Sequence, residues 1–229
     1  IFRASTGLWA VRNLTRLYFG GLGDDPVPAD YNGDGTTDPA IFRYWNGLWA
    51  IREISRIYFG DSFDQPRPGD YDGDGSDDLG LFREDSGLWA IRGITRLYFG
   101  GSGDVPAPGY YDGSGAMAPA LFRASTGLWA IRGISRIYFG QTADTAVAGD
   151  YDGDGQWGSA IFRPSTGLWA VRGLTRAYFG SGVDQPRPAD YTGDAGDDIG
   201  IFRASSGLWA VQGVTRIYFG ASGDDAVTR

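Results

Sequence analysis

The residues in this sequence best suited to chemistry are aspartates that recur in short loops with a fixed spacing. The stretch GDYDGDGSDD, residues 69–78, follows the pattern D-x-[DN]-x-D-G-x-x-D from its second residue onward. Positions 1, 3, 5 and 9 provide carboxylates or an amide, position 7 provides a backbone carbonyl, and the glycine at position 6 permits a sharp turn around an ion. Because calcium prefers six to eight oxygen ligands, and the loop offers no nitrogen or sulfur donor, the pattern predicts a calcium site.

The loop occurs five times, and its copies differ in completeness. Two copies are complete, namely Asp30, Asn32, Asp34, Thr36 (carbonyl) and Asp38, and Asp70, Asp72, Asp74, Ser76 (carbonyl) and Asp78. Two further copies are imperfect: Asp150, Asp152, Asp154 and Gln156 (carbonyl), with Gly158 in place of the last carboxylate, and Asp190, Thr192, Asp194 and Asp198, with Ala195 in place of glycine. The remaining copy has Tyr110, Asp112, Ser114 and Ala118, and we expect no metal there.

An alternative interpretation is that these loops are turns in which aspartate side chains accept hydrogen bonds from nearby backbone N–H groups. That interpretation is the better one for an isolated DGDG. Two complete nine-residue sets at a fixed place in a repeat favour metal binding instead. Since all ligands of a site come from one local loop and no base lies near them in the sequence, we expect the Ca²⁺ to be structural.

The composition removes most catalytic chemistry. The sequence has no His and no Cys, and all 20 basic residues are Arg. A hydrolase would need paired carboxylates, yet the only glutamates, Glu53 and Glu84, stand at unmatched repeat positions. A net charge of −8 disfavours nucleic acid and anionic membranes as partners, and no apolar run is long enough to span a membrane. The sequence therefore predicts a protein that is not an enzyme.

The loops are carried by a repeat of 40 residues. The segment IFRASTGLWAVRNLTRLYFG and its near-copies begin at residues 1, 41, 81, 121, 161 and 201. In the second repeat, apolar and β-branched runs separated by turn residues predict strands at Pro39–Arg43, Leu48–Arg52, Arg56–Phe59 and the proline-containing Pro66–Asp70. Four strands in 40 residues is typical of one blade of a β-propeller.

The positions of the two ends predict how the blades close. Six full repeats would be 6 × 40 = 240 residues, whereas the chain has 229, and the 11 absent ones correspond to residues 30–40. Asp225–Arg229 matches the first strand of a blade, and Ile1–Phe19 supplies the other three. We therefore predict an all-β, six-bladed β-propeller in one domain, residues 1–229, with four-stranded antiparallel blades and a C-terminal strand that pairs with the N-terminal blade. In an open β-solenoid, the two ends of the chain would not need to complete one sheet together.

The segment PRPGDYDGDGSDDLGLFR, preceded by YFG, resembles the FG-GAP/VCBS-type repeats of integrin-α-like propellers. The resemblance covers the whole chain, and the GLWA[IV]R and YFG segments point to a bacterial branch. It implies calcium in the hairpin loops and an extracellular or cell-surface location. It does not imply one activity, because such repeats occur in adhesion receptors, in lectins and beside bacterial enzymes. Ile1 is not a methionine and the first residues lack the features of a signal peptide, so we expect an excised or mature, secreted, monomeric piece.

Aromatic and arginine residues recur in every repeat and allow two interpretations. Trp recurs at 9, 49, 89, 129, 169 and 209, and Arg recurs in registers such as Arg43, Arg52 and Arg56. Trp beside Arg and Asp is typical of sugar-binding pockets, but one Trp per blade is also what packing between blades requires. Because an invariant residue in every blade follows from packing symmetry, the pattern favours packing.

Two connections vary more between repeats, and both are expected on the face opposite the calcium loops. Their unusual residues are Tyr44, Trp45, Phe63 and Glu84, which are candidate ligand contacts, although drift in solvated loops explains them equally well. Together these observations predict a calcium-stabilised, non-enzymatic binding propeller that recognises carbohydrate or protein. The alternative is a ligand-free scaffold that arose from recent repeat amplification or engineering.

Overall fold

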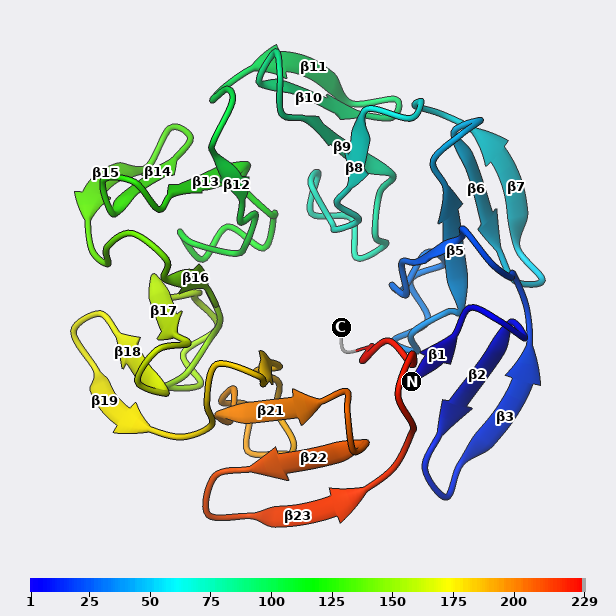
Figure 1. Cartoon of the computed structure of the whole chain (residues 1–229). Coiled ribbons are helices and arrows are strands. Elements are labelled where there is room, and N and C mark those ends of the chain that lie inside the picture. The colour runs from blue at the N-terminus through cyan, green and yellow to red at the C-terminus, as the bar shows by residue number, and fades with distance from the viewer. Residues whose placement is uncertain (228–229) are drawn as a thin grey trace. The chain divides into compact units, whose positions relative to one another are not determined.

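The chain is an all-β, six-bladed β-propeller, which confirms the predicted fold class (Figure 1). The computed structural model describes residues 1–227, and all regular elements in that range are strands. No helix within the described range is long and apolar enough to cross a membrane. The described residues divide into two compact units, each of which holds three antiparallel sheets.

The first unit comprises Ile1–Ser102 and Gly223–Val227. Its first blade contains β1 (Phe2–Arg3), β2 (Leu8–Val11) and β3 (Thr15–Tyr18). Its second blade contains β4 (Asp25–Pro26), β5 (Ala40–Arg43), β6 (Leu48–Ile51) and β7 (Ser55–Tyr58). Its third blade contains β8 (Asp64–Pro66), β9 (Gly80–Arg83), β10 (Leu88–Ile91) and β11 (Thr95–Tyr98).

The second unit comprises Gly103–Ser222. The fourth blade contains β12 (Val105–Pro106), β13 (Ala120–Arg123), β14 (Leu128–Ile131) and β15 (Ser135–Tyr138). The fifth blade contains β16 (Thr145–Ala146), β17 (Ala160–Arg163), β18 (Leu168–Val171) and β19 (Thr175–Tyr178). The sixth blade contains β20 (Gln185–Pro186), β21 (Gly200–Arg203), β22 (Leu208–Val211) and β23 (Thr215–Tyr218).

Strands within a blade follow chain order, so each acidic loop joins the first strand of a blade to the second. Three of the four strands predicted for the second repeat agree with β5, β6 and β7 to within a residue. The fourth prediction, Pro66–Asp70, is wrong by several residues, because β8 covers Asp64–Pro66. Beyond Pro66 the backbone pairs only through the Arg67 N–H to Gly80 O and an isolated bridge between Gly69 and Asp78, because the chain turns into the acidic loop there. The matching strand β16 ends at the same place although Ala148 replaces Pro68, so the proline is not the cause.

The predicted pairing of the two chain ends is present, but it is shorter than a strand. Phe2 and Asp225 exchange backbone hydrogen bonds of 2.9 and 2.8 Å as one isolated bridge, so the first blade has three strands rather than the predicted four. In the second blade the ladder continues because Val27 N–H donates to Ala40 O. The residue matching Ala40 would precede Ile1, so the given chain offers no acceptor. Residues 228 and 229 of the predicted strand lie outside the described residues.

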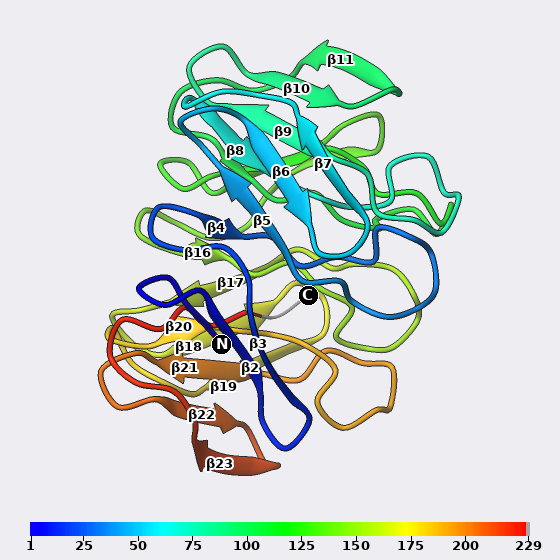
Figure 2. The same ribbon diagram turned by 90° about the vertical axis from the view of Figure 1, so that its right-hand side faces the viewer.

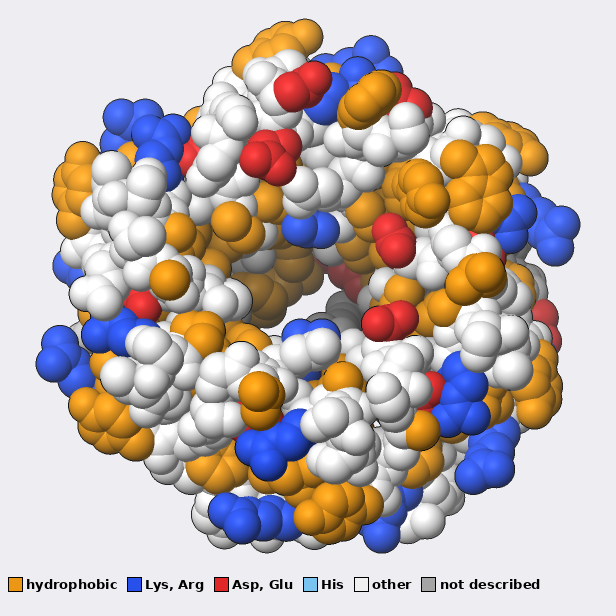
Figure 3. Space-filling view, in the orientation of Figure 1, with side chains coloured by type: hydrophobic (Ala, Val, Ile, Leu, Met, Phe, Trp, Pro, Cys, Tyr) orange, Lys and Arg blue, Asp and Glu red, His pale blue; other side chains and the backbone are white. Residues whose placement is uncertain are grey.

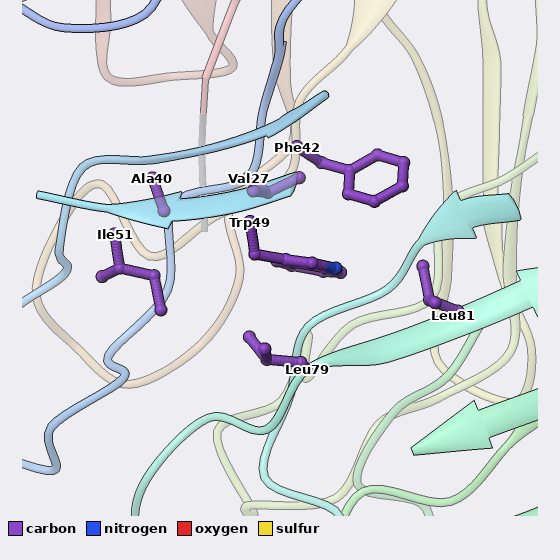
Figure 4. Close-up of a cluster of buried hydrophobic side chains, with 7 residues drawn as sticks. All are labelled: Val27, Ala40, Phe42, Trp49, Ile51, Leu79 and Leu81. Atoms are coloured by element: carbon purple, nitrogen blue, oxygen red, sulfur yellow. The ribbon is translucent and has the colours of Figure 1, made fainter. Parts of the chain in front are cut away.

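The tryptophan register forms the core between blades. Trp49 is fully buried in a cluster with Val27, Ala40, Phe42, Ile51, Leu79 and Leu81. Figure 4 shows its indole ring lying flat between the second blade and Leu79 and Leu81 of the third blade. The Trp49 Nε1–H donates to Phe59 O at 3.0 Å, and the same bond is made by the Trp of every other blade. This arrangement supports packing as the role of the register.

Candidate functional site

The loop of residues 70–78 is wrapped around the buried carboxylate of Asp70. The Oδ1 atom accepts hydrogen bonds from Gly73 N at 2.6 Å and Asp74 N at 3.2 Å, and Oδ2 accepts one from Gly75 N at 2.9 Å. Gly73 and Gly75 reach these positions with φ of +79° and +92°, which glycine adopts without strain. The aspartate at position 1 therefore accepts three backbone N–H groups of its own loop, as the turn interpretation requires.

The same loop also brings three carboxylates together. One oxygen of each of Asp70, Asp72 and Asp78 lies within 4.8 Å of the others. Burial raises the pKa of Asp78 to about 6, and the charges of Asp72 and its neighbours act in the same direction. A cation would relieve this repulsion, and hard oxygen donors are what calcium prefers. The residues present therefore fit a calcium ion, except that Asp74 uses its Oδ1 to accept the Ser76 N–H at 2.8 Å and lies outside the group.

The loop of residues 30–38 has the same turn but fewer charges. Asp30 accepts hydrogen bonds from Gly33, Asp34 and Gly35, as Asp70 does in its own loop. Asn32 stands where the other loop has Asp72, so this loop holds one carboxylate fewer. Burial raises the pKa of Asp38, although the Tyr31 N–H that it accepts opposes the shift. The predicted ligands are present, with a neutral amide at position 3.

The two imperfect loops keep the turn as well. Asp150, Asp152 and Asp154 converge within 4.8 Å of one another, even though Gly158 provides no carboxylate at position 9. In the loop of residues 190–198, Ala195 takes a φ of +76°, like the glycines at the same position elsewhere, and its N–H donates to Asp190 Oδ2 at 3.1 Å. The departures from the pattern thus change the available ligands and leave the course of the backbone intact.

The copy expected to bind no metal has an aromatic ring contact at position 1. The ring of Trp157 lies edge-on to Tyr110, with centroids 5.9 Å apart, and Trp157 N–H donates to Tyr110 O at 2.7 Å. Asp112 accepts the Ser114 N–H. Among residues 1–227, the converging acidic groups are those of the loops at 70–78 and 150–158, so this copy contributes none.

Adjacent loops are joined by a pair of hydrogen bonds that the sequence analysis did not find. Asp77 N–H donates to Asp30 O, and Asp30 N–H donates to Asp77 Oδ2, both at 2.7 Å. Asp197 and Asp150 repeat the arrangement in the second unit. Figure 2 shows the loops of residues 30–38 and 70–78 side by side at one end of their blades. The constant separation of 47 residues could have indicated the pairing, but only if neighbouring loops were known to touch.

Each blade also carries a buried carboxylate paired with an arginine, which sequence reasoning missed. Asp144 accepts hydrogen bonds from Arg163 Nε at 2.7 Å and Nη2 at 2.9 Å. Equivalent pairs occur in all six blades: Asp24–Arg43, Asp64–Arg83, Asp104–Arg123, Asp184–Arg203 and Asp224–Arg3. The separation of 19 residues recurs in five of the six pairs and was an available signal, whereas Arg3 and Asp224 are 221 residues apart. Such bidentate pairs fix the start of each blade to the strand that carries the arginine.

The four candidate ligand contacts do not form one pocket. Trp45 is half exposed, with Tyr44 edge-on to it and the Arg43 guanidinium 5.1 Å from its ring centroid. Phe63 is 71% exposed, and Glu84 accepts a long hydrogen bond of 3.4 Å from Gln65. All four lie in the variable connections, as predicted. None of them lines either of the two clefts described next.

Two clefts of the same construction lie between neighbouring blades. One has a volume of about 220 Å³ and lies between the second and third blades, where Leu81, Leu88, Arg83 and Arg96 line it. The other has a volume of about 310 Å³ and lies between the fourth and fifth blades, where Ile161, Leu168, Arg163 and Arg176 line it. Each cleft is lined by apolar side chains and by two guanidinium groups. This combination suits a small ligand that has both an apolar face and polar or anionic groups.

Comparison with protein-family models, with curated proteins and with solved structures finds no match for this chain. The resemblance to FG-GAP/VCBS-type repeats therefore stays a prediction from the sequence.

Proposed function

We propose that this chain is a calcium-stabilised, non-enzymatic binding propeller of the FG-GAP/VCBS type, which acts outside the cell or at its surface and recognises carbohydrate or protein. The observation that supports it best is the convergence of Asp70, Asp72 and Asp78 in a loop that recurs at the same place in five of the six blades. The recurrence favours a role in the architecture, because a catalytic centre would need to occur only once.

Calcium would be held by these three carboxylates together with the Ser76 carbonyl, and in the fifth blade by Asp150, Asp152 and Asp154. The ion would offset the burial and the repulsion from neighbouring carboxylates that together raise the pKa of Asp78. Because the folded loop binds the ion and the unfolded chain does not, calcium would stabilise the fold by mass action. The hydrogen bonds between adjacent loops would carry this effect from one blade to its neighbour.

A matched pair of substitutions tests the calcium part of the proposal. Asp72 and Asp112 occupy the same loop position, and each accepts the N–H of the residue two positions later. Asp72→Ala and Asp112→Ala therefore lose the same turn hydrogen bond, and only Asp72→Ala also loses a converging carboxylate. We expect the rise in melting temperature with millimolar calcium, relative to chelator, to shrink in Asp72→Ala and to stay unchanged in Asp112→Ala. An equal loss in both variants would contradict a metal site at residues 70–78.

The binding part is tested with a broad glycan array, run with labelled protein in millimolar calcium and again with chelator. Binding to a related set of sugars in calcium would support carbohydrate recognition. A blank array, with the fold shown intact by circular dichroism, would contradict it and leave protein recognition as the proposed activity. Each outer strand has a largely exposed tyrosine, such as Tyr138. These rings provide contact area for a carbohydrate or a protein ligand.

A further inference from the structure

The clefts between blades differ in charge, although their walls are built alike. In the cleft of the fourth and fifth blades, Arg163 is neutralised by the buried Asp144, so Arg176 remains as the uncompensated charge. Arg176 is exposed on β19 and shows no ion pair within the described part of the chain. Figure 3 shows basic side chains beside hydrophobic ones over the outer strands β19 and β23.

The cleft between the second and third blades has a second carboxylate, which cancels the excess positive charge. Asp61 lies 2.6 Å from Arg83 Nη2, in addition to the bidentate pair of Arg83 with Asp64. Gln141 stands at the matching position of the other cleft and makes the same backbone contact, since Asp61 N–H and Gln141 N–H both donate to the aspartate three residues later at 2.9 Å. The two clefts therefore differ by one negative charge on an equivalent backbone.

The remaining groups of the larger cleft define what would fit it. Arg163 uses two of its five N–H groups in hydrogen bonds to Asp144, so three N–H groups remain for a ligand. The side chains of Leu168 and Ala170 provide apolar surface beside the guanidinium groups. A volume of about 310 Å³ is at the small end of ligand sites, so the ligand must be compact.

We propose that the cleft between the fourth and fifth blades binds a compact anionic ligand, namely a sugar unit that carries a carboxylate or a sulfate. Arg176 and the remaining donors of Arg163 receive the anion, and Leu168 and Ala170 contact the apolar face of the ring. The equivalent cleft at Arg96 rejects the same ligand because Asp61 repels it. This inference deepens the binding function proposed above and rests on it, but it does not depend on calcium in the loops.

The test uses the arginine Nε–H resonances of the ¹⁵N-labelled protein at low salt, because these report on each cleft separately. Arg176→Gln and Arg96→Gln assign the two signals. The probes are D-glucuronate, neutral D-glucose and inorganic sulfate, each titrated into the wild type and into Asp61→Gln. We expect glucuronate to shift the Arg176 signal saturably, at least 10-fold more tightly than the Arg96 signal, which matches a hydrogen bond to a charged group. In Asp61→Gln, the Arg96 signal is expected to shift with an affinity close to that of Arg176.

Each result decides between supporting and overturning the proposal. Tighter binding of glucuronate than of sulfate supports a sugar acid, and equal binding supports an oxyanion site that also takes sulfated sugars. An Arg176 signal that does not move, that moves equally with glucose, or that moves no more tightly than Arg96 in the wild type overturns it. The calcium-dependent melting temperature is measured on the same sample. If calcium raises the melting temperature but the Arg176 signal does not move, this inference alone is rejected. If calcium does not raise the melting temperature, the result counts against the proposed calcium-stabilised fold.

Discussion

Replacing Ala195 with glycine is expected to stabilise the protein, because this alanine stands where the other loops have glycine. Its φ is +76°, in the left-handed region that an L-residue with a side chain avoids. The matching glycines have φ of +82°, +92°, +84° and +82°, and an added Cβ would meet no atom within 4 Å at any of them: Gly35, Gly75, Gly115 and Gly155. The expected cost at this position is therefore one of backbone conformation and not of a steric clash.

The magnitude follows from two opposing effects. A left-handed conformation costs an L-residue about 1–2 kcal/mol relative to its preferred regions. Relieving this cost stabilises the folded state, but glycine also increases the conformational entropy of the unfolded chain, which lowers the free energy of unfolding by about 0.4–1 kcal/mol. With the middle of each range, the net increase in the free energy of unfolding for Ala195→Gly is about 0.8 kcal/mol. For a chain of this size, that corresponds to about 1–4 °C in melting temperature.

The assay is urea unfolding followed by tryptophan fluorescence, in chelator so that metal binding does not contribute. Gly155→Ala is the matched reverse variant, and we expect it to lower the free energy of unfolding by a similar amount. The m-values should stay unchanged in both, because the same surface is exposed on unfolding. If Ala195→Gly is neutral or destabilising while Gly155→Ala destabilises, the left-handed turn at residue 195 carries no strain and the reasoning is refuted.

Three further predictions concern the turns, the buried ion pairs and the acidic loops. Gly167→Ala is expected to cost more than about 3 kcal/mol, because an added Cβ would collide with the backbone oxygen of Gly180. Gly173→Ala, with φ of +80° and open space around it, should cost about 1 kcal/mol in the same chemical denaturation experiment. Arg203→Ala is expected to cost about 2–3 kcal/mol, measured by calorimetry, because it leaves the buried Asp184 carboxylate without its partner; a loss below about 0.5 kcal/mol would show the pair to be a surface contact. Burial raises the pKa of Asp197 to about 6, so the folded state favours its protonated form. In chelator the melting temperature should therefore fall as pH rises from about 4 to about 7, and Asp197→Asn should flatten that profile.

The acidic loops show how local sequence can determine both a turn and a set of ligands. Their short polar side chains and paired glycines bond within nine residues, so the pattern predicts the turn without any tertiary information. The same locality made the sequence ambiguous about their purpose. The structure shows Asp70 both folding its loop through three N–H groups and converging with Asp72 and Asp78. The turn and the metal-site interpretations therefore describe the same side chains.

The 40-residue period determined the fold class, because apolar alternation and turn residues repeat six times and one blade cannot bury both of its faces alone. The period also predicted that the C-terminal segment pairs with the N-terminal blade, and the bridge between Phe2 and Asp225 is where the two meet. Only the tertiary structure decided which recurring residues meet. Asp144 and Arg163 pair across 19 residues, Asp30 and Asp77 across 47, and Gln141 in place of Asp61 changes the charge of a cleft. Such contacts depend on how strands and loops from separate parts of the chain come together, and that distance information is not contained in the local pattern of residue types.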